Sequence, residues 1–294
     1  MVNILFSVDE GGYEGLVATI NSIISKKENP KERYNFYILG TNSYNFYLDL
    51  INLNPYDKFY IENFYNTKYN NQRQILFNLL KKQNYKTDNI AHNNMMNYAR
   101  IFLPEIFKQV KKGIYLDNDL IIQKDIRNLF NIDLGEKITA APLTRNLDKY
   151  MNFPDIIPEL NINVDKTYKG FNAGVYLYSL EKWRENEMTK KAIEILYFNM
   201  EKRKIMRHGT QPLMNLLFNG RMKAIDKRWN FTGLGWRKGI EDYKLENAYI
   251  LHWSGPKKPW LQEGLYKEYW VIHNHKFRVP IACTAKNHSI YEQV

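Results

Sequence analysis

Near the middle of the chain lies the stretch Gly113-Ile114-Tyr115-Leu116-Asp117-Asn118-Asp119-Leu120-Ile121-Ile122, in which two carboxylates interrupt an apolar run. A short apolar run of this kind predicts a buried strand. Where the chain turns out of a strand, the alternation of side chains breaks, so both carboxylates can converge on one hard cation. Burying two carboxylates without a cation would be costly. Asp117 and Asp119 are therefore predicted metal ligands.

Apolar runs and helical patterns alternate along the rest of the sequence. Helical spacing of apolar residues predicts helices around residues 16–24, 97–111 and 181–204. The order strand, helix, strand predicts an α/β fold with a mostly parallel sheet that is covered on both faces. The predicted strands are 3–8, 35–39, 58–63, 113–116, 138–142, 174–180 and 248–253.

Two other predicted strands also end in residues that could bind a ligand or a metal ion. The first strand ends in Ser7-Val8-Asp9, and a late one ends in Ile250-Leu251-His252-Trp253. In open α/β sheets ligands bind beyond the carboxyl ends of the strands, so these ends are candidate site segments. A histidine beside an apolar run is usually a hydrogen-bonded core residue. Here the following loop, Gly255-Pro256-Lys257-Lys258-Pro259-Trp260, adds cations that suit a metal-bound diphosphate.

The composition narrows the class of protein. A chain of 294 residues with 44% hydrophobic residues can bury a sizeable core. No apolar run is long enough for a spanning helix and the first residues do not read as a signal peptide, so we expect a cytoplasmic protein. One cysteine, Cys283, excludes an intrachain disulfide. The net charge of +11 implies an anionic partner, for which nucleic acid, nucleotide-sugar phosphates and an acidic membrane all qualify.

Taken together, five segments resemble glycosyltransferase family 8, the retaining transferases that include glycogenin and the bacterial lipooligosaccharide galactosyltransferases. The segments occur in the order 3–9 with Tyr13, then Tyr98-Ala99-Arg100-Ile101-Phe102-Leu103-Pro104, 114–119, Phe171-Asn172-Ala173-Gly174-Val175 and 252–260. The resemblance implies a GT-A Rossmann-like mixed sheet flanked by helices over residues 1–260. A smaller C-terminal helical or loop segment would follow over 261–294.

The resemblance also implies a Mn²⁺ or Mg²⁺ ion, a UDP-sugar donor such as UDP-glucose or UDP-galactose, and retention at the anomeric carbon. It assigns the metal to Asp117, Asp119 and His252. Asp9 would accept from the uracil, and Tyr13 would stack on it. The other implied contacts with the donor come from Ser7, Val8, Arg100, Asn118, Asn172, Ala173, Gly255 and Lys258.

The sequence departs from the family at two places. Where many members carry Asp-Gln-Asp, this chain has Thr210-Gln211-Pro212, so Gln211 alone matches and is the candidate group beneath the anomeric carbon. Thr144 and Arg145 replace an acid that often follows an earlier strand. Because an amide is a poor nucleophile, we expect front-face substitution, in which the departing phosphate takes the acceptor proton.

Partners and competing interpretations follow from the same residues. The acceptor would be a glycan, a lipid-linked sugar or a protein. The basic and aromatic C-terminal stretch either packs on the domain or touches an anionic membrane. A UDP-sugar-binding protein without turnover and a basic nucleic-acid-binding protein remain alternatives, although no nucleic-acid-binding motif is present and no nucleic-acid partner is expected.

Overall fold

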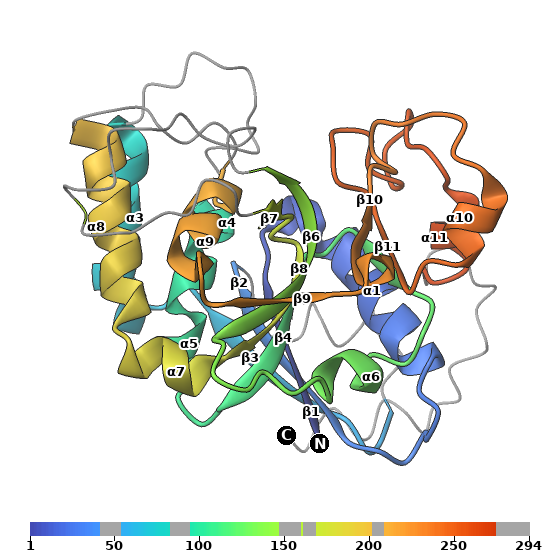
Figure 1. The fold of residues 1–294 in the computed structure, drawn as a ribbon, viewed down its shortest axis with the longest axis horizontal. Coiled ribbons are helices and arrows are strands. Elements are labelled where there is room, and N and C mark those ends of the chain that lie inside the picture. The colour runs from blue at the N-terminus through green and yellow to red at the C-terminus, as the bar shows by residue number, and fades with distance from the viewer. Residues whose placement is uncertain (42–53, 83–94, 147–159, 161–168, 202–208, 275–294) are drawn as a thin grey trace.

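The fold is known from a computed structural model, which describes residues 1–41, 54–82, 95–146, 160, 169–201 and 209–274 (Figure 1). Three sequence predictions fall outside the described residues. These are the end of the helix expected over 181–204, Cys283, and the part of the C-terminal segment beyond residue 274.

An eight-stranded mixed sheet forms the centre of the molecule. The neighbouring strands from β3 to β4 are parallel, whereas β8 runs antiparallel to both β4 and β6. The mixed sheet implied by the family resemblance is confirmed, and the mostly parallel sheet expected from the strand-helix order holds for one half only. The strand order is β3 (Lys58–Asn63), β2 (Tyr34–Gly40), β1 (Val2–Ser7), β4 (Lys112–Leu116), β8 (Val175–Ser179), β6 (Thr139–Asn146) and β7 (Lys169–Phe171), with β9 (Met222–Ile225) paired to β6.

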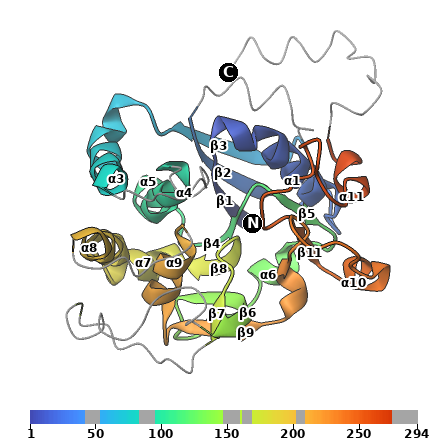
Figure 2. The ribbon, with the colours of Figure 1, turned by 90° about the horizontal axis from the view of Figure 1, so that it is seen from above.

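Helices cover both faces of this sheet, as Figure 2 shows. Side chains alternate along β1, so Ile4 and Phe6 pack with α1 (Tyr13–Ser25) and Leu5 packs on the other face. That other face is covered by α3 (Asn70–Lys82), α8 (Met188–Glu201) and α9 (Gln211–Phe218), among others. Burying each large aliphatic side chain contributes about 1.5–3 kcal/mol, so both faces help to hold the sheet together.

Two predicted helices are broken in the structure. The helix expected over 97–111 is divided into α4 (Met95–Ala99), a 3₁₀ turn at Arg100–Phe102 and α5 (Leu103–Ile106). Pro104 lacks an N–H, so an unbroken α-helix could not form its hydrogen bond there. The helix expected from residue 181 begins as α7 (Leu180–Glu185) and is interrupted before α8, where Glu187 adopts a φ of 51°.

A second, three-stranded sheet contains β10 (Phe231–Thr232), β11 (Ile250–His252) and β5 (Leu120–Ile122). Because β5 follows β4 after three residues, the chain passes from the large sheet into the small one through the turn at 117–119. The remaining short elements are η1 (Glu10–Gly12), η2 (Thr67–Tyr69), α6 (Arg127–Phe130), η6 (Lys227–Asn230), α10 (Asp242–Glu246) and α11 (Glu268–Val271).

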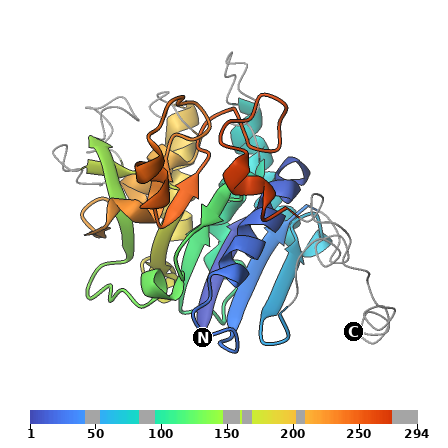
Figure 3. The ribbon, with the colours of Figure 1, turned by 90° about the vertical axis from the view of Figure 1, so that its right-hand side faces the viewer.

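The described end of the chain packs against α1. Figure 3 shows α1 lying along the face of the main sheet that carries Ile4 and Phe6. Trp270 of α11 is buried and lies with its ring centroid 6.1 Å from that of Trp260, in one cluster with Ala18 and Trp253. Asn21 of α1 donates to the backbone carbonyl of His273 at 2.9 Å. A domain boundary at residue 260 stays a prediction. None of the described helices is long and apolar enough to cross a membrane.

Candidate metal and donor site

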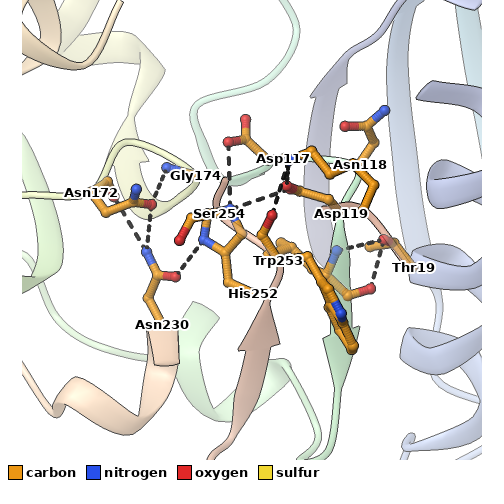
Figure 4. Close-up of polar contacts among 12 residues, drawn as sticks. Thr19, Asp117, Asn118, Asp119, Asn172, Gly174, Asn230, His252, Trp253 and Ser254 are labelled. Carbon is orange, nitrogen blue, oxygen red and sulfur yellow. Dashed lines mark hydrogen bonds and ion pairs between the residues drawn. The ribbon is translucent and has the colours of Figure 1, made fainter. Parts of the chain in front are cut away.

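Segments that are far apart in the sequence meet beyond the carboxyl end of β4 (Figure 4). His252 pairs with Leu120 in the small sheet, which brings the imidazole beside the turn at 117–119. The backbone N–H of Trp253 donates to the carbonyl of Asp119 at 3.0 Å, and that of Asp117 donates to Gly174 at 2.8 Å. Two of the strand ends singled out by sequence, at 117–119 and 252–253, thus meet at this turn.

The predicted metal ligands Asp117, Asp119 and His252 lie together. One ligand atom from each lies within 4.8 Å of the other two. Nε2 of His252 is 3.2 Å from Oδ1 of Asp119 and 4.0 Å from Oδ2 of Asp117. Oδ1 of Asp119 is buried and has no hydrogen-bond partner within the described part of the chain. A divalent cation between these atoms would satisfy this buried oxygen.

The second polar atom of each predicted ligand side chain contacts another residue. Oδ1 of Asp117 accepts from Arg100 and from the Tyr115 hydroxyl, both at 3.1 Å. Oδ2 of Asp119 accepts from Lys258, and Nδ1 of His252 lies 2.8 Å from Oδ1 of Asn230. Because each outer atom is engaged, the three inner atoms are left facing one another, as metal ligands with outer-shell support do.

The two carboxylates differ in their surroundings. The Asp119 side chain is 5% exposed, whereas that of Asp117 is 27% exposed, so the expectation that both are buried is wrong for Asp117. Asp117 is open because it faces the site rather than the core. Burial by itself would raise the pKa of Asp119, but the ammonium group of Lys258 beside it holds that pKa well below its usual range. Asp119 is therefore ionised at neutral pH and available to a cation.

Arg100 and Lys258 were predicted to contact the donor, and in the structure both hold carboxylates. The buried Arg100 donates to Asn97, Asp117 and the carbonyl of Ala173. Its guanidinium also stacks on Tyr115, 4.5 Å from the ring centroid. Lys258 donates to the carbonyl of Trp253 as well as to Asp119. The Arg100 side chain, which holds Asp117, is 6% exposed. The Lys258 side chain, which holds Asp119, is more open, at 28% exposed.

Gly174 leaves the space that the cluster needs. A Cβ atom added there would lie 2.4 Å from Cε1 of His252 and 2.7 Å from Oδ2 of Asp117. Real Cβ atoms do not approach other atoms so closely. Any side chain at this position would therefore fill the space between His252 and Asp117.

The predicted uridine edge follows β1. Ser7 donates to the carbonyl of Met96 at 2.6 Å, and Val8 is buried with its N–H bonded to Leu39 at 3.0 Å. Burial raises the pKa of Asp9. Tyr13 is 4% exposed, and its hydroxyl lies 2.9 Å from Oγ1 of Thr41. Tyr13 packs in the apolar cluster with the other buried residues of α1.

Asn118 connects the segment after β1 to the turn at 117–119. Its Nδ2 atom donates to the carbonyl of Gly12 at 2.7 Å. A Cβ at Gly12 would lie 1.7 Å from that Nδ2 atom, so a glycine is required for the contact. Gly255 adopts a φ of 119° in the loop between His252 and Lys258, and a Cβ there would lie 2.9 Å from the carbonyl oxygen of Gly235. Asn118 and Gly255 thus lie in the two segments that carry the clustered residues, next to Asp117 and Asp119 and after His252.

Asn172 and Gln211 meet on the other side of the cluster. Nδ2 of Asn172 donates to Oε1 of Gln211 at 3.0 Å, and Asn172 also contacts Asn230. Sequence reasoning missed Asn230. It ends a 3₁₀ turn beside the two-residue strand β10, and so short an element shows no periodicity that could place it near His252.

Known proteins resemble this chain in sequence. Residues 3–264 match the family described as "Glycosyl transferase family 8". Probable galacturonosyltransferase 5 of Arabidopsis thaliana is 33% identical over 206 residues, which cover 66% of this chain and 33% of the relative. Probable galacturonosyltransferase-like 10 of the same plant is 29% identical, with 89% of this chain and 71% of the relative covered. The chain spans about a third of the length of the first of these two relatives.

Solved structures share the fold. The galactosyltransferase LgtC, determined with donor and acceptor sugar analogues, superposes with a TM-score of 0.65 at 20% identity, covering 95% of this chain and 98% of that one. The glycosyltransferase GlyE of Streptococcus pneumoniae gives a TM-score of 0.63 at 21% identity, covering 93% and 60%. Since the family match extends over most of the sequence, the chain belongs to glycosyl transferase family 8.

Proposed function

We propose that this chain transfers a hexosyl group from a UDP-sugar to an acceptor hydroxyl, with Mn²⁺ or a similar cation held by Asp117, Asp119 and His252. One observation carries the proposal. The three inner ligand atoms face one another while their outer atoms are engaged by other residues. Family membership supplies the chemical context. When bound, the ion would neutralise the diphosphate and so make UDP a better leaving group.

The remaining roles follow from position and charge. Asp9 lies just beyond the carboxyl end of β1, where the uridine would be recognised, whereas Tyr13 is buried at the start of α1. Lys258 is the cation that can turn from Asp119 toward the diphosphate, because its side chain is partly exposed. Arg100, by contrast, is buried, so in this proposal it positions Asp117 rather than touching the donor.

Gln211 is the candidate group beside the anomeric carbon. Its Oε1 accepts one hydrogen bond from Asn172, which leaves a second lone pair for the positive charge that develops in the transition state. An amide does not form a stable covalent intermediate as a carboxylate does. The proposal therefore keeps retention by front-face substitution, with the departing phosphate accepting the proton of the acceptor hydroxyl.

UDP-glucose and UDP-galactose are the proposed donors, and UDP-galacturonic acid is the second candidate because the two plant relatives are named galacturonosyltransferases. The acceptor would be a glycan, a lipid-linked sugar or a protein in the cytoplasm. A cytoplasmic location and contact with the inner face of a membrane stay proposals.

UDP release tests this function. The purified chain would be incubated with each donor, with and without Mn²⁺, and compared with the double variant Asp117→Asn/Asp119→Asn. Asp242→Asn, an exposed acid at the start of α10, is the matched control. Release that needs the metal, favours one donor and is lost in the double variant alone supports the proposal. Binding of UDP-sugar with no release would indicate a protein without turnover.

A further inference from the structure

We propose that Asn230 is a positioning residue that keeps the imidazole proton of His252 on Nδ1, so that the lone pair of Nε2 faces Asp117 and Asp119. The same residue also donates to Asn172, and so supports the amide that donates to Gln211. This inference rests on the proposed function, because it concerns the metal ligand and the amide of that site. It assigns a role to a residue for which the sequence showed no signal.

A single backbone N–H fixes the orientation of the first two amides. Gly174 N donates to Oδ1 of Asn172 at 3.0 Å. A backbone N–H can only donate, so the atom that it contacts must be the amide oxygen. Nδ2 of Asn172 therefore points the other way and donates to Oε1 of Gln211 at 3.0 Å. The amide of Gln211 is thereby set with its oxygen toward Asn172.

The amide of Asn230 is oriented by its acceptors in the same way. One end of the Asn230 amide lies 3.1 Å from Oδ1 of Asn172 and 3.3 Å from its backbone carbonyl oxygen. Both of those atoms are acceptors, so this end must be the NH₂ group. The other end, Oδ1, lies 2.8 Å from Nδ1 of His252. An acceptor at that distance requires the proton on Nδ1, and neutral imidazole then carries its lone pair on Nε2.

Burial favours one tautomer of His252 over the other. Asn230 is 6% exposed and His252 is 2% exposed, so solvent water is largely excluded from the contact. The opposite tautomer would place two lone pairs against each other and direct an N–H toward the carboxylates and the cation. Outer-shell partners of metal-bound histidines typically change metal affinity or activity by about 10–100-fold when they are replaced.

Two substitutions separate the two ends of Asn230. Asn230→Leu has a similar size and removes both hydrogen bonds. Asn230→Asp keeps an oxygen that accepts from Nδ1 of His252, but it places a second oxygen against the two oxygens of Asn172. Asn35→Leu is the control, because Asn35 is also buried and bonds Asn3 at 3.0 Å, at the start of β2 and away from the site.

Mn²⁺ affinity is measured first by calorimetry without nucleotide. We expect Asn230→Leu to lose about 10–100-fold in affinity, while Asn230→Asp and Asn35→Leu stay near the wild type. UDP release should fall in both Asn230 variants, since each one loses the support of Asn172 and Gln211. Equal Mn²⁺ affinity in Asn230→Leu and the wild type would overturn the proposal.

The tautomer is measured directly by ¹⁵N NMR of histidine-labelled protein, with His252→Gln used to assign the signal. The wild type and Asn230→Asp should show the proton of His252 on Nδ1, and Asn230→Leu should lose this preference. If Asn230→Leu does not fold, a neutral imidazole whose only proton is on Nε2, in Asn230→Asp or in the wild type, overturns the proposal equally well. Normal Mn²⁺ and NMR results without UDP release from any donor would contradict the proposed function and leave this inference standing.

Discussion

Replacing Gly174 by alanine adds one methyl group beside the cluster of Asp117, Asp119 and His252. The added Cβ would lie 2.4 Å from Cε1 of His252 and 2.7 Å from Oδ2 of Asp117, so at least one ligand must move. Overpacking of this kind typically costs about 1–3 kcal/mol, which for a chain of this size lowers Tm by about 2–5 °C. Because the displaced atoms belong to two predicted ligands, we expect Mn²⁺ affinity to fall at least about tenfold.

The assay compares thermal unfolding with and without Mn²⁺. A ligand at 100 times its Kd stabilises a protein by about 2.7 kcal/mol, so the wild type should gain Tm with the metal and Gly174→Ala should gain much less. Gly113→Ala is the control, because its Cβ would meet the flexible end of Leu5 at 2.3 Å, at the start of β4 and away from the cluster. A Mn²⁺-dependent gain in Gly174→Ala equal to that of the wild type would refute the assignment.

Three further outcomes follow from charge and burial. Burial raises the folded-state pKa of Asp9 above its ordinary value of 3.8. The protonated carboxyl therefore stabilises the folded protein fully below pH 3.8, and this contribution is lost as the pH rises through the raised pKa. Asp9→Asn should therefore raise Tm at pH 7 but not at pH 3.5, while weakening UDP binding; an unchanged UDP affinity would contradict the uracil role. Lys258→Met should weaken binding of UDP with Mn²⁺ by about 10–100-fold, less so at high salt, and a calorimetric titration showing no loss would exclude a diphosphate contact. Lys27→Met breaks a fully buried ion pair with Asp57 and should cost about 3–5 kcal/mol in urea unfolding, without changing Mn²⁺ affinity once folded.

The sequence predicted the elements that have strong local patterns. The strands around 3–8 and 35–39 and the helix carrying Leu16, Val17 and Ile20 were recognised because apolar periodicity reports burial directly. The convergence of Asp117, Asp119 and His252 was predicted from strand ends and from the family resemblance. It is confirmed as a geometric cluster, because both sheets bring their ends to the same turn.

Features that depend on tertiary contacts were not predictable in the same way. Asn230 precedes a strand of only two residues, and its role depends on the orientation of three amides that lie far apart in the sequence. The pairing of Arg100 with Asp117 was missed because composition gives the charges but not their partners. The direction of β8 was missed because the strand-helix order does not show that β8 enters the sheet where β4 leaves it.

The most direct test of the proposed metal site is a crystal structure with Mn²⁺ and UDP, recorded where manganese scatters anomalously. A peak is predicted within coordination distance of Oδ2 of Asp117, Oδ1 of Asp119 and Nε2 of His252, with the diphosphate on its open side. A peak at any other place, or contact through Nδ1 of His252, would contradict the central claim that these three inner atoms form the metal site of a UDP-sugar transferase.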